Sequence, residues 1–98
     1  MINQNYIVRQ NKGRSRIWIE GRRLIEAGFV SGSRFDLFNG SDGIELTLTE
    51  EGRRKVSGSN GRAIIDLCGA ACEPFKTGEN VGIHYSHGSI VIYFEGAQ

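Results

Sequence analysis

The sequence has few of the residues that build special structures, with two cysteines and one proline in 98 residues. Two cysteines are too few for a fold held together by disulfides, and we expect a protein of the reducing cytoplasm. No apolar run approaches the roughly 20 residues that a membrane-spanning helix needs. The first residues show no basic segment followed by an apolar one, so we expect no signal peptide.

Glycine, in contrast, is abundant, with 14 residues in the chain. A hydrophobic share of 39% is enough for a compact core. Together, these features predict one small folded domain with many tight turns.

Charge is unevenly spread along the chain. Residues 1–62 hold eleven of the twelve basic residues and seven of the eleven acidic ones, a net charge of +4, whereas residues 63–98 carry −3. A basic half in a nearly neutral chain predicts a local anion-binding face. The alternative is that these arginines are simply solvated surface residues.

The chain contains an internal repeat. Similar residues recur 46 positions apart, without a gap, from Arg16 and Arg62 to Leu48 and Phe94. A weaker match precedes each copy and is shifted by two residues; it pairs Val8, Gly13 and Arg14 with Val56, Gly61 and Arg62. We interpret residues 1–98 as one domain built of two repeats, at about 6–50 and 54–96.

Each repeat predicts the same elements. A short strand, 16–20 or 62–66, is followed by a short helix, 21–27 or 67–73, and Asp66 is a good cap for the second helix. A glycine-rich turn then joins two strands, 34–38 with 44–48 and 81–85 with 90–94. One repeat cannot bury much alone, so we expect a shared core of Ile17, Ile19, Phe29, Phe35, Leu37, Ile64, Phe75, Val81, Ile83, Ile92 and Phe94.

The segment from Gly13 to Phe29, GRSRIWIEGRRLIEAGF, resembles the swapped-hairpin β-barrel of AbrB-, SpoVT- and MazE-type DNA-binding proteins. Residues 27–32 are similar to the SymE group of that superfamily. Similar tandem segments can precede bacterial or phage DNA cytosine methyltransferases. The resemblance implies a mainly β fold: two swapped-hairpin units, each with a short helix, would form a small pseudo-two-fold barrel. It also implies DNA binding through basic loops.

The resemblance and the charge pattern together give a set of candidate DNA contacts. Arginine suits these positions because its planar fork fits phosphates and guanine edges. The alternatives are that the helix arginines are exposed and paired with Glu20 and Glu26, and that the basic linker is a soluble loop. The candidates are Arg14, Arg16, Arg22, Arg23, Arg53, Arg54, Lys55 and Arg62.

The second repeat departs from this pattern, since Cys68 and Gly69 stand at the places of Arg22 and Arg23 when the repeats are aligned without a gap. We therefore do not expect the two repeats to bind a palindrome symmetrically. The acidic second repeat is either a structural partner or a surface for another protein.

Other chemistry has weaker support. The spacing of Cys68, Cys72, His84 and His87 misses that of zinc fingers, and packing explains the cysteines better. Trp18 and Tyr85 are interpreted as packing residues, although base stacking stays open for Trp18. No nucleophile motif occurs, and Asp36, Asp42 and Glu45 lack a metal-ligand spacing. We expect no enzyme and no cofactor.

These observations predict a small DNA-binding protein, a transcriptional regulator or the DNA-recognition accessory of a bacterial or phage mobile element. Its partner would be duplex DNA, and homodimerisation is open because sheet edges can stay exposed. The alternative is a protein-interaction module, antitoxin-like or a phage-encoded inhibitor of a host defence complex. A SymE-like RNA-directed toxin is a third option, but it would need nuclease residues that the sequence does not show.

Overall fold

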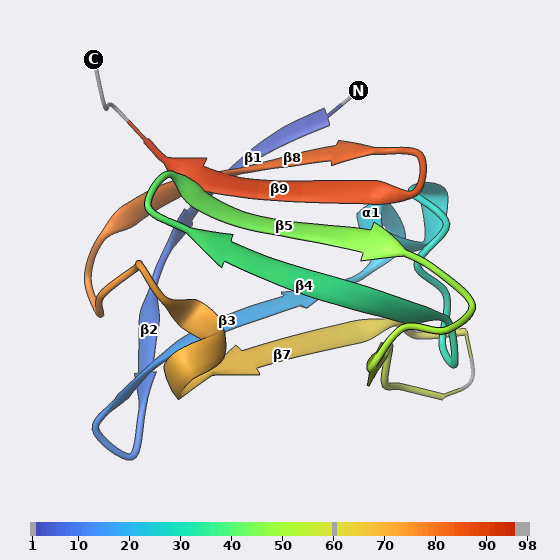
Figure 1. Ribbon diagram of the computed structural model, residues 1–98, viewed down its shortest axis with the longest axis horizontal. Coiled ribbons are helices and arrows are strands. Elements are labelled where there is room, and N and C mark those ends of the chain that lie inside the picture. The colour runs from blue at the N-terminus through green and yellow to red at the C-terminus, as the bar shows by residue number, and fades with distance from the viewer. Residues whose placement is uncertain (1, 60, 96–98) are drawn as a thin grey trace.

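The computed structural model describes residues 2–59 and 61–95 as nine strands, one short α-helix and one 3-10 turn (Figure 1). The α-helix is α1 (Arg22–Glu26) and the 3-10 turn, η1, is Gly69–Cys72. The strands are β1 (Ile2–Ile7), β2 (Arg9–Asn11), β3 (Arg14–Glu20), β4 (Arg34–Gly40), β5 (Gly43–Leu48), β6 (Arg54–Lys55), β7 (Ile64–Cys68), β8 (Asn80–Ser86) and β9 (Ser89–Phe94).

The strands form two layers. The upper layer in Figure 1 is a six-stranded sheet in the order β1-β8-β9-β5-β4-β6, and the lower one is a three-stranded sheet in the order β2-β3-β7. Every strand pair is antiparallel. The prediction of a mainly β fold is confirmed, with 53% of the residues in strands, but the two sheets are not closed into a barrel.

The two hairpins follow the predicted repeat closely. The hairpin β4–β5 has the same strand bounds as β8–β9, 46 residues later. Glu45 on β5 pairs with Val91 on β9, the residue 46 positions further on, so a pseudo-two-fold axis passes between these strands. The four predicted hairpin strands are thus confirmed.

Before the hairpins, the repeat has a different spacing. Arg9 pairs with Arg16 across the first turn, and Ser57 pairs with Ile64 across the second, 48 residues later. Gly13 and Gly61 fill the same place in these turns, with φ angles of 80° and 81°. At this spacing Ile17 corresponds to Ile65, Trp18 to Asp66, and Ile19 to Leu67. The gapless alignment is therefore wrong ahead of Phe29 and Phe75.

The spacing between equivalent residues changes from 48 to 46 in the segment predicted as a short helix. Seven residues separate Gly21 from Phe29, but only five separate Gly69 from Phe75. The longer connection forms α1 within the predicted 21–27, whereas the shorter one forms a tighter 3-10 turn. The prediction of a helix over 67–73 is wrong for its first residues, which belong to β7. Asp66 lies in the middle of β7 and caps no helix.

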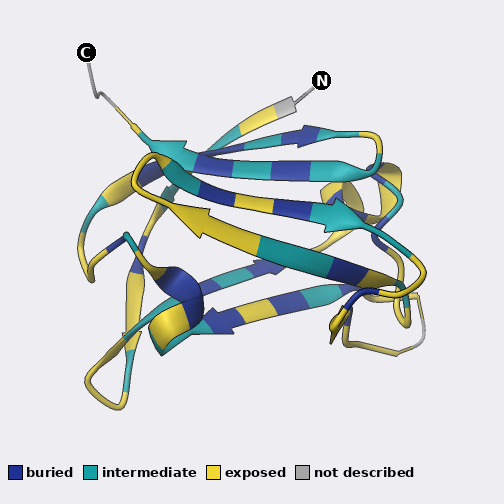
Figure 2. Cartoon of the chain, in the orientation of Figure 1, coloured by how far each residue is buried: buried dark blue, intermediate teal, exposed yellow. Residues whose placement is uncertain are grey.

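The core lies between the two layers, as the buried residues in Figure 2 show. Most of the predicted core is confirmed, and Leu37 and Phe94 pack against it while partly buried. Ile64 is wrong as a core residue, because the shifted register turns it to the outer face of the three-stranded sheet, beside Glu20. No hydrophilic side chain is buried among the described residues.

Candidate nucleic-acid interface

The outer face of the three-stranded sheet and its adjoining turns carry a group of cations. On β3, buried Ile17 and Ile19 alternate with Arg16, Trp18 and Glu20, which face outward. The pairing places Arg9 of β2 beside Arg16, and Asp66 of β7 beside Trp18. The segments 9–20 and 61–68 together contain five basic residues and two acidic ones: Arg9, Lys12, Arg14, Arg16 and Arg62 against Glu20 and Asp66.

Both acidic side chains of this sheet are paired with arginine. Arg16 donates two hydrogen bonds of 2.9 Å to the carboxylate of Asp66, and this bonding raises the pKa of Arg16 above its ordinary value. Arg62 contacts Glu20 at 3.3 Å. The carboxylates are therefore neutralised by their partners, which leaves Arg9, Lys12 and Arg14 as exposed positive charge on the same sheet.

Aromatic rings lie among these arginines. The Arg16 guanidinium sits 4.7 Å from the centre of the Trp18 ring, and that of Arg9 sits 5.8 Å from the centre of the Tyr6 ring. The Tyr6 hydroxyl accepts a 2.8 Å hydrogen bond from the Trp18 backbone N–H. The Trp18 indole N–H donates to Glu20. Two aromatic residues, each beside a guanidinium, are thus joined through the backbone of β3.

An open groove runs along this pair of rings, between β3 and the chain from β1 into β2. Tyr6, Arg9, Trp18 and Glu20 line it, together with the amide side chains of Gln4, Asn5 and Asn80 and the exposed Ile7. The groove exists because β2 pairs with β3 only as far as Arg16, while β1 belongs to the other sheet.

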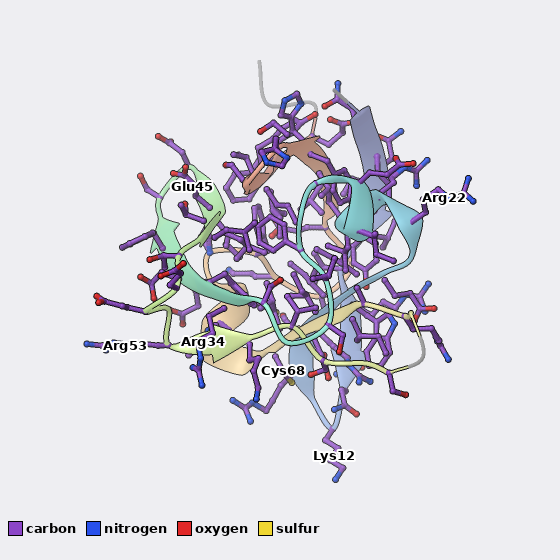
Figure 3. The ribbon with its side chains drawn as sticks, turned by 90° about the vertical axis from the view of Figure 1, so that its right-hand side faces the viewer. Lys12, Arg22, Arg34, Glu45, Arg53 and Cys68 are labelled. Atoms are coloured by element: carbon purple, nitrogen blue, oxygen red, sulfur yellow. The ribbon has the colours of Figure 1, made fainter. Side chains whose placement is uncertain are left out.

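The predicted basic residues do not form one compact patch. Arg14 and Arg22 lie at opposite ends of β3, which at about 3.3 Å per residue separates them by at least roughly 20 Å. Figure 3 shows Lys12, Arg22 and Arg53 pointing away from the molecule in three directions. The strand and helix arginines are therefore not gathered in one place, because an extended strand lies between them.

The other candidates occupy the two flanks. Arg22 and Arg23 are exposed on α1, while Arg54 and Lys55 form β6 at the far edge of the six-stranded sheet. The backbone N–H of Arg53 donates to Asp36 at 3.0 Å. The predicted polar linker therefore includes an ordered edge strand.

Two of the four acidic residues of the second repeat have internal partners. Asp66 holds Arg16, and Glu79 accepts a 2.7 Å hydrogen bond from the backbone N–H of Lys76. Asp66, paired with a cation, consequently offers little free negative charge for a partner protein.

The cysteines and histidines lie in separate places. Cys72 is buried, its thiol donates to the Leu67 carbonyl at 3.1 Å, and burial raises its pKa to about 11. His84 bonds to Asn3 on the outer face of the six-stranded sheet, and His87 lies in a turn beside Gly28. Within residues 2–59 and 61–95, no group of three His, Cys, Asp or Glu side chains could hold a metal ion.

Two residues of this site are more prominent than the sequence indicates. Trp18 is only half-buried and faces outward rather than into the core; alternation with Ile17 and Ile19 is the signal that indicates this. Tyr6 is absent from the predicted site, and no sequence signal places it beside Trp18, because the contact joins two different sheets.

Comparisons with protein-family models, with curated proteins and with solved structures give no match to this chain. Among the described residues, no helix has the length and apolar character needed to cross a membrane.

Proposed function

We propose that the protein is a non-enzymatic, cytoplasmic DNA-binding protein that contacts duplex DNA through its three-stranded sheet. The observation that carries this proposal is the distribution of charge on that sheet: five cations face two carboxylates, and both carboxylates are already paired with arginine. Such a surface attracts phosphates and releases counterions from DNA on binding. The cellular role we propose is a transcriptional regulator or a recognition accessory of a bacterial or phage mobile element.

The pseudo-symmetry supports a contact at two points. Arg14 and Arg62 occupy equivalent places 48 residues apart, at opposite ends of the β3–β7 ribbon. Arg22 and Arg23 add charge near the Arg62 end, since Gly21 donates to the Ala63 carbonyl there. Arg14 and Arg62 would bind phosphates at two separate places along a duplex.

The contacts between the repeats also support a swapped-hairpin arrangement, which is the finer part of the proposal. The Gly88 N–H, in the turn of the second hairpin, donates to the Ala27 carbonyl of the first repeat at 2.8 Å. Reciprocally, the Asn39 amide of the first hairpin donates to carbonyls of Ala70, Ala71 and Glu73. Each hairpin therefore covers the short helical segment of the other repeat.

The experiment is a fluorescence-anisotropy titration of labelled duplex DNA at several salt concentrations. We expect Arg14→Ala combined with Arg62→Ala to weaken binding and to lower the slope of log affinity against log salt by about 0.9 for each phosphate that the variant no longer neutralises. Arg22→Ala with Arg23→Ala should act in the same direction. The matched control is Arg53→Ala with Arg54→Ala, which removes the same charge from the β6 edge of the six-stranded sheet and should change the slope least. If both pairs on the three-stranded side leave affinity and slope unchanged, the assignment is wrong.

A second candidate function, a protein-interaction module, has one observation in its favour. Phe38 is 61% exposed on the outer face of the six-stranded sheet, where the pairing aligns it with Glu45 and Val91. An antitoxin-like domain or an inhibitor of a defence complex would use such a face. A purified partner that binds the wild type but not Phe38→Ser, together with no binding of duplex DNA, would favour this function over the first.

A further inference from the structure

We propose that the groove along Trp18 and Tyr6 binds unpaired nucleotides of a single-stranded nucleic acid, with a base stacked on Trp18. The inference rests on the assignment of the three-stranded sheet as the nucleic-acid face, and it names a second form of ligand for that face. The groove combines aromatic rings, the guanidinium of Arg9 and amide side chains, which are the groups that hold single strands by stacking, charge and hydrogen bonding.

The pseudo-symmetry provides an internal comparison for this groove. At the equivalent places of the second repeat, Asp66 stands for Trp18, Arg54 for Tyr6 and Ser57 for Arg9. The strands are shorter there, since β6 has two residues and Ser57 forms an isolated bridge with Ile64, and no aromatic ring stands at these places. Tyr6 packs partly against the core, whereas Trp18 faces outward, so core packing does not explain the ring of Trp18.

The indole of Trp18 is prepared for stacking. Its N–H is already bonded to Glu20, so the polar atom of the ring needs no water. The paired Arg16 guanidinium holds the ring at 4.7 Å, which limits the rotamer freedom that binding would otherwise remove. A ring that is only half-buried and fixed in this way loses little entropy when a base covers it.

The electrostatics of the groove favour an anionic strand. Arg9 lines it, and Lys12 and Arg14 extend the positive charge towards the β2–β3 turn, where Figure 3 shows Lys12 projecting. Glu20 is the acidic side chain that lines the groove, and it is paired with Arg62. The amides of Gln4, Asn5 and Asn80 can hydrogen-bond base edges.

The chain carries its own reporter, because Trp18 is its one tryptophan. We would titrate the whole protein with oligothymidylate and with oligouridylate of about twelve nucleotides, a length within the range that small single-strand-binding domains cover. Saturable quenching of Trp18 fluorescence by either polymer is the expected result. The ratio of the two affinities distinguishes single-stranded DNA from RNA as the preferred source of the nucleotides.

Variants separate stacking from general charge. Trp18→Thr keeps a strand-forming residue and should weaken binding of labelled oligothymidylate about tenfold or more. Phe38→Thr is the matched control, since it removes an exposed aromatic ring from the other sheet and should leave this affinity unchanged. Thermal unfolding confirms that each variant is folded, and Trp18→Phe, which keeps a smaller ring, should bind with intermediate affinity.

The outcomes distinguish the two proposals. If the protein binds duplex DNA but neither oligonucleotide quenches Trp18, the groove assignment is overturned and the proposed function stands. Equal losses for Trp18→Thr and Phe38→Thr would also overturn it. Quenching without duplex binding would support the groove and overturn the duplex proposal, and absence of both kinds of binding would overturn both.

Discussion

The two repeats of this chain resemble each other in their hairpins and differ in the segments that precede them. The strands β4 and β5 recur as β8 and β9 with identical lengths, because they pair with each other about the pseudo-two-fold axis. The first repeat carries α1, Trp18 and two helix arginines, whereas the second carries a 3-10 turn, Asp66 and two cysteines. The shared half supports the core, and the divergent half holds the candidate binding groups.

Alanine substitution of the equivalent core rings, Phe29 and Phe75, should lower the unfolding free energy most. The loss should be similar in the two repeats. Phe29 packs edge-on against Phe35, and Phe75 against Phe94, so each alanine substitution removes a buried ring contact. We expect each variant to lose about 3–5 kcal/mol of unfolding free energy in a single urea transition. A two-step transition, with only one step shifted, would show that the repeats unfold separately.

The hairpins could be predicted from the sequence because a glycine turn between alternating strands is a local signal. The spacing between the strands that open the two repeats could not be predicted, because a shift of two residues preserves the inside–outside alternation of a strand. Residues 62–66 and 64–68 therefore fit the second strand equally well in polarity. Only the pairing of Ser57 with Ile64 decides between them, and that pairing fixes Trp18 and Asp66 as equivalents.

A smaller difference between the repeats should appear in the dependence of the unfolding free energy on pH. Leu24 and buried Cys72 correspond at the 48-residue spacing, and only Cys72 titrates. Burial raises the pKa of Cys72 from 9.0 to about 11. The folded state thus favours the neutral thiol, so this stabilisation is complete below pH 9 and is lost as the pH rises towards 11.

Urea unfolding from pH 8 upwards measures this loss, which should reach at most about 2–3 kcal/mol. Cys72→Ala should flatten the fall between pH 9 and 10, below the range of Tyr85, whose pKa burial raises from 10.0 to about 12. An equally steep fall in the variant would assign the pH dependence to other groups.

The smallest expected effect comes from a substitution that makes the second repeat more like the first. Ala70 is exposed on η1 and corresponds to Arg22 at the 48-residue spacing. It lies at the Arg14 end of the β3–β7 ribbon, as Arg22 lies at the Arg62 end. Ala70→Arg should strengthen duplex DNA binding and raise the salt slope by about 0.9. Ala70→Gln is the uncharged control, and an unchanged slope for Ala70→Arg would show that DNA does not reach this end of the ribbon.

The strand order of the six-stranded sheet has a consequence for the sequence of events during synthesis. β1 pairs with β8, so residues 2–7 find their partner only after residues 80–86 have been made. β3 likewise waits for β7, and β5 for β9. Contacts so distant along the chain slow folding, and a ribosome-bound first repeat would keep unpaired strand edges until the second repeat emerges. The chain is therefore most exposed to aggregation during its own translation.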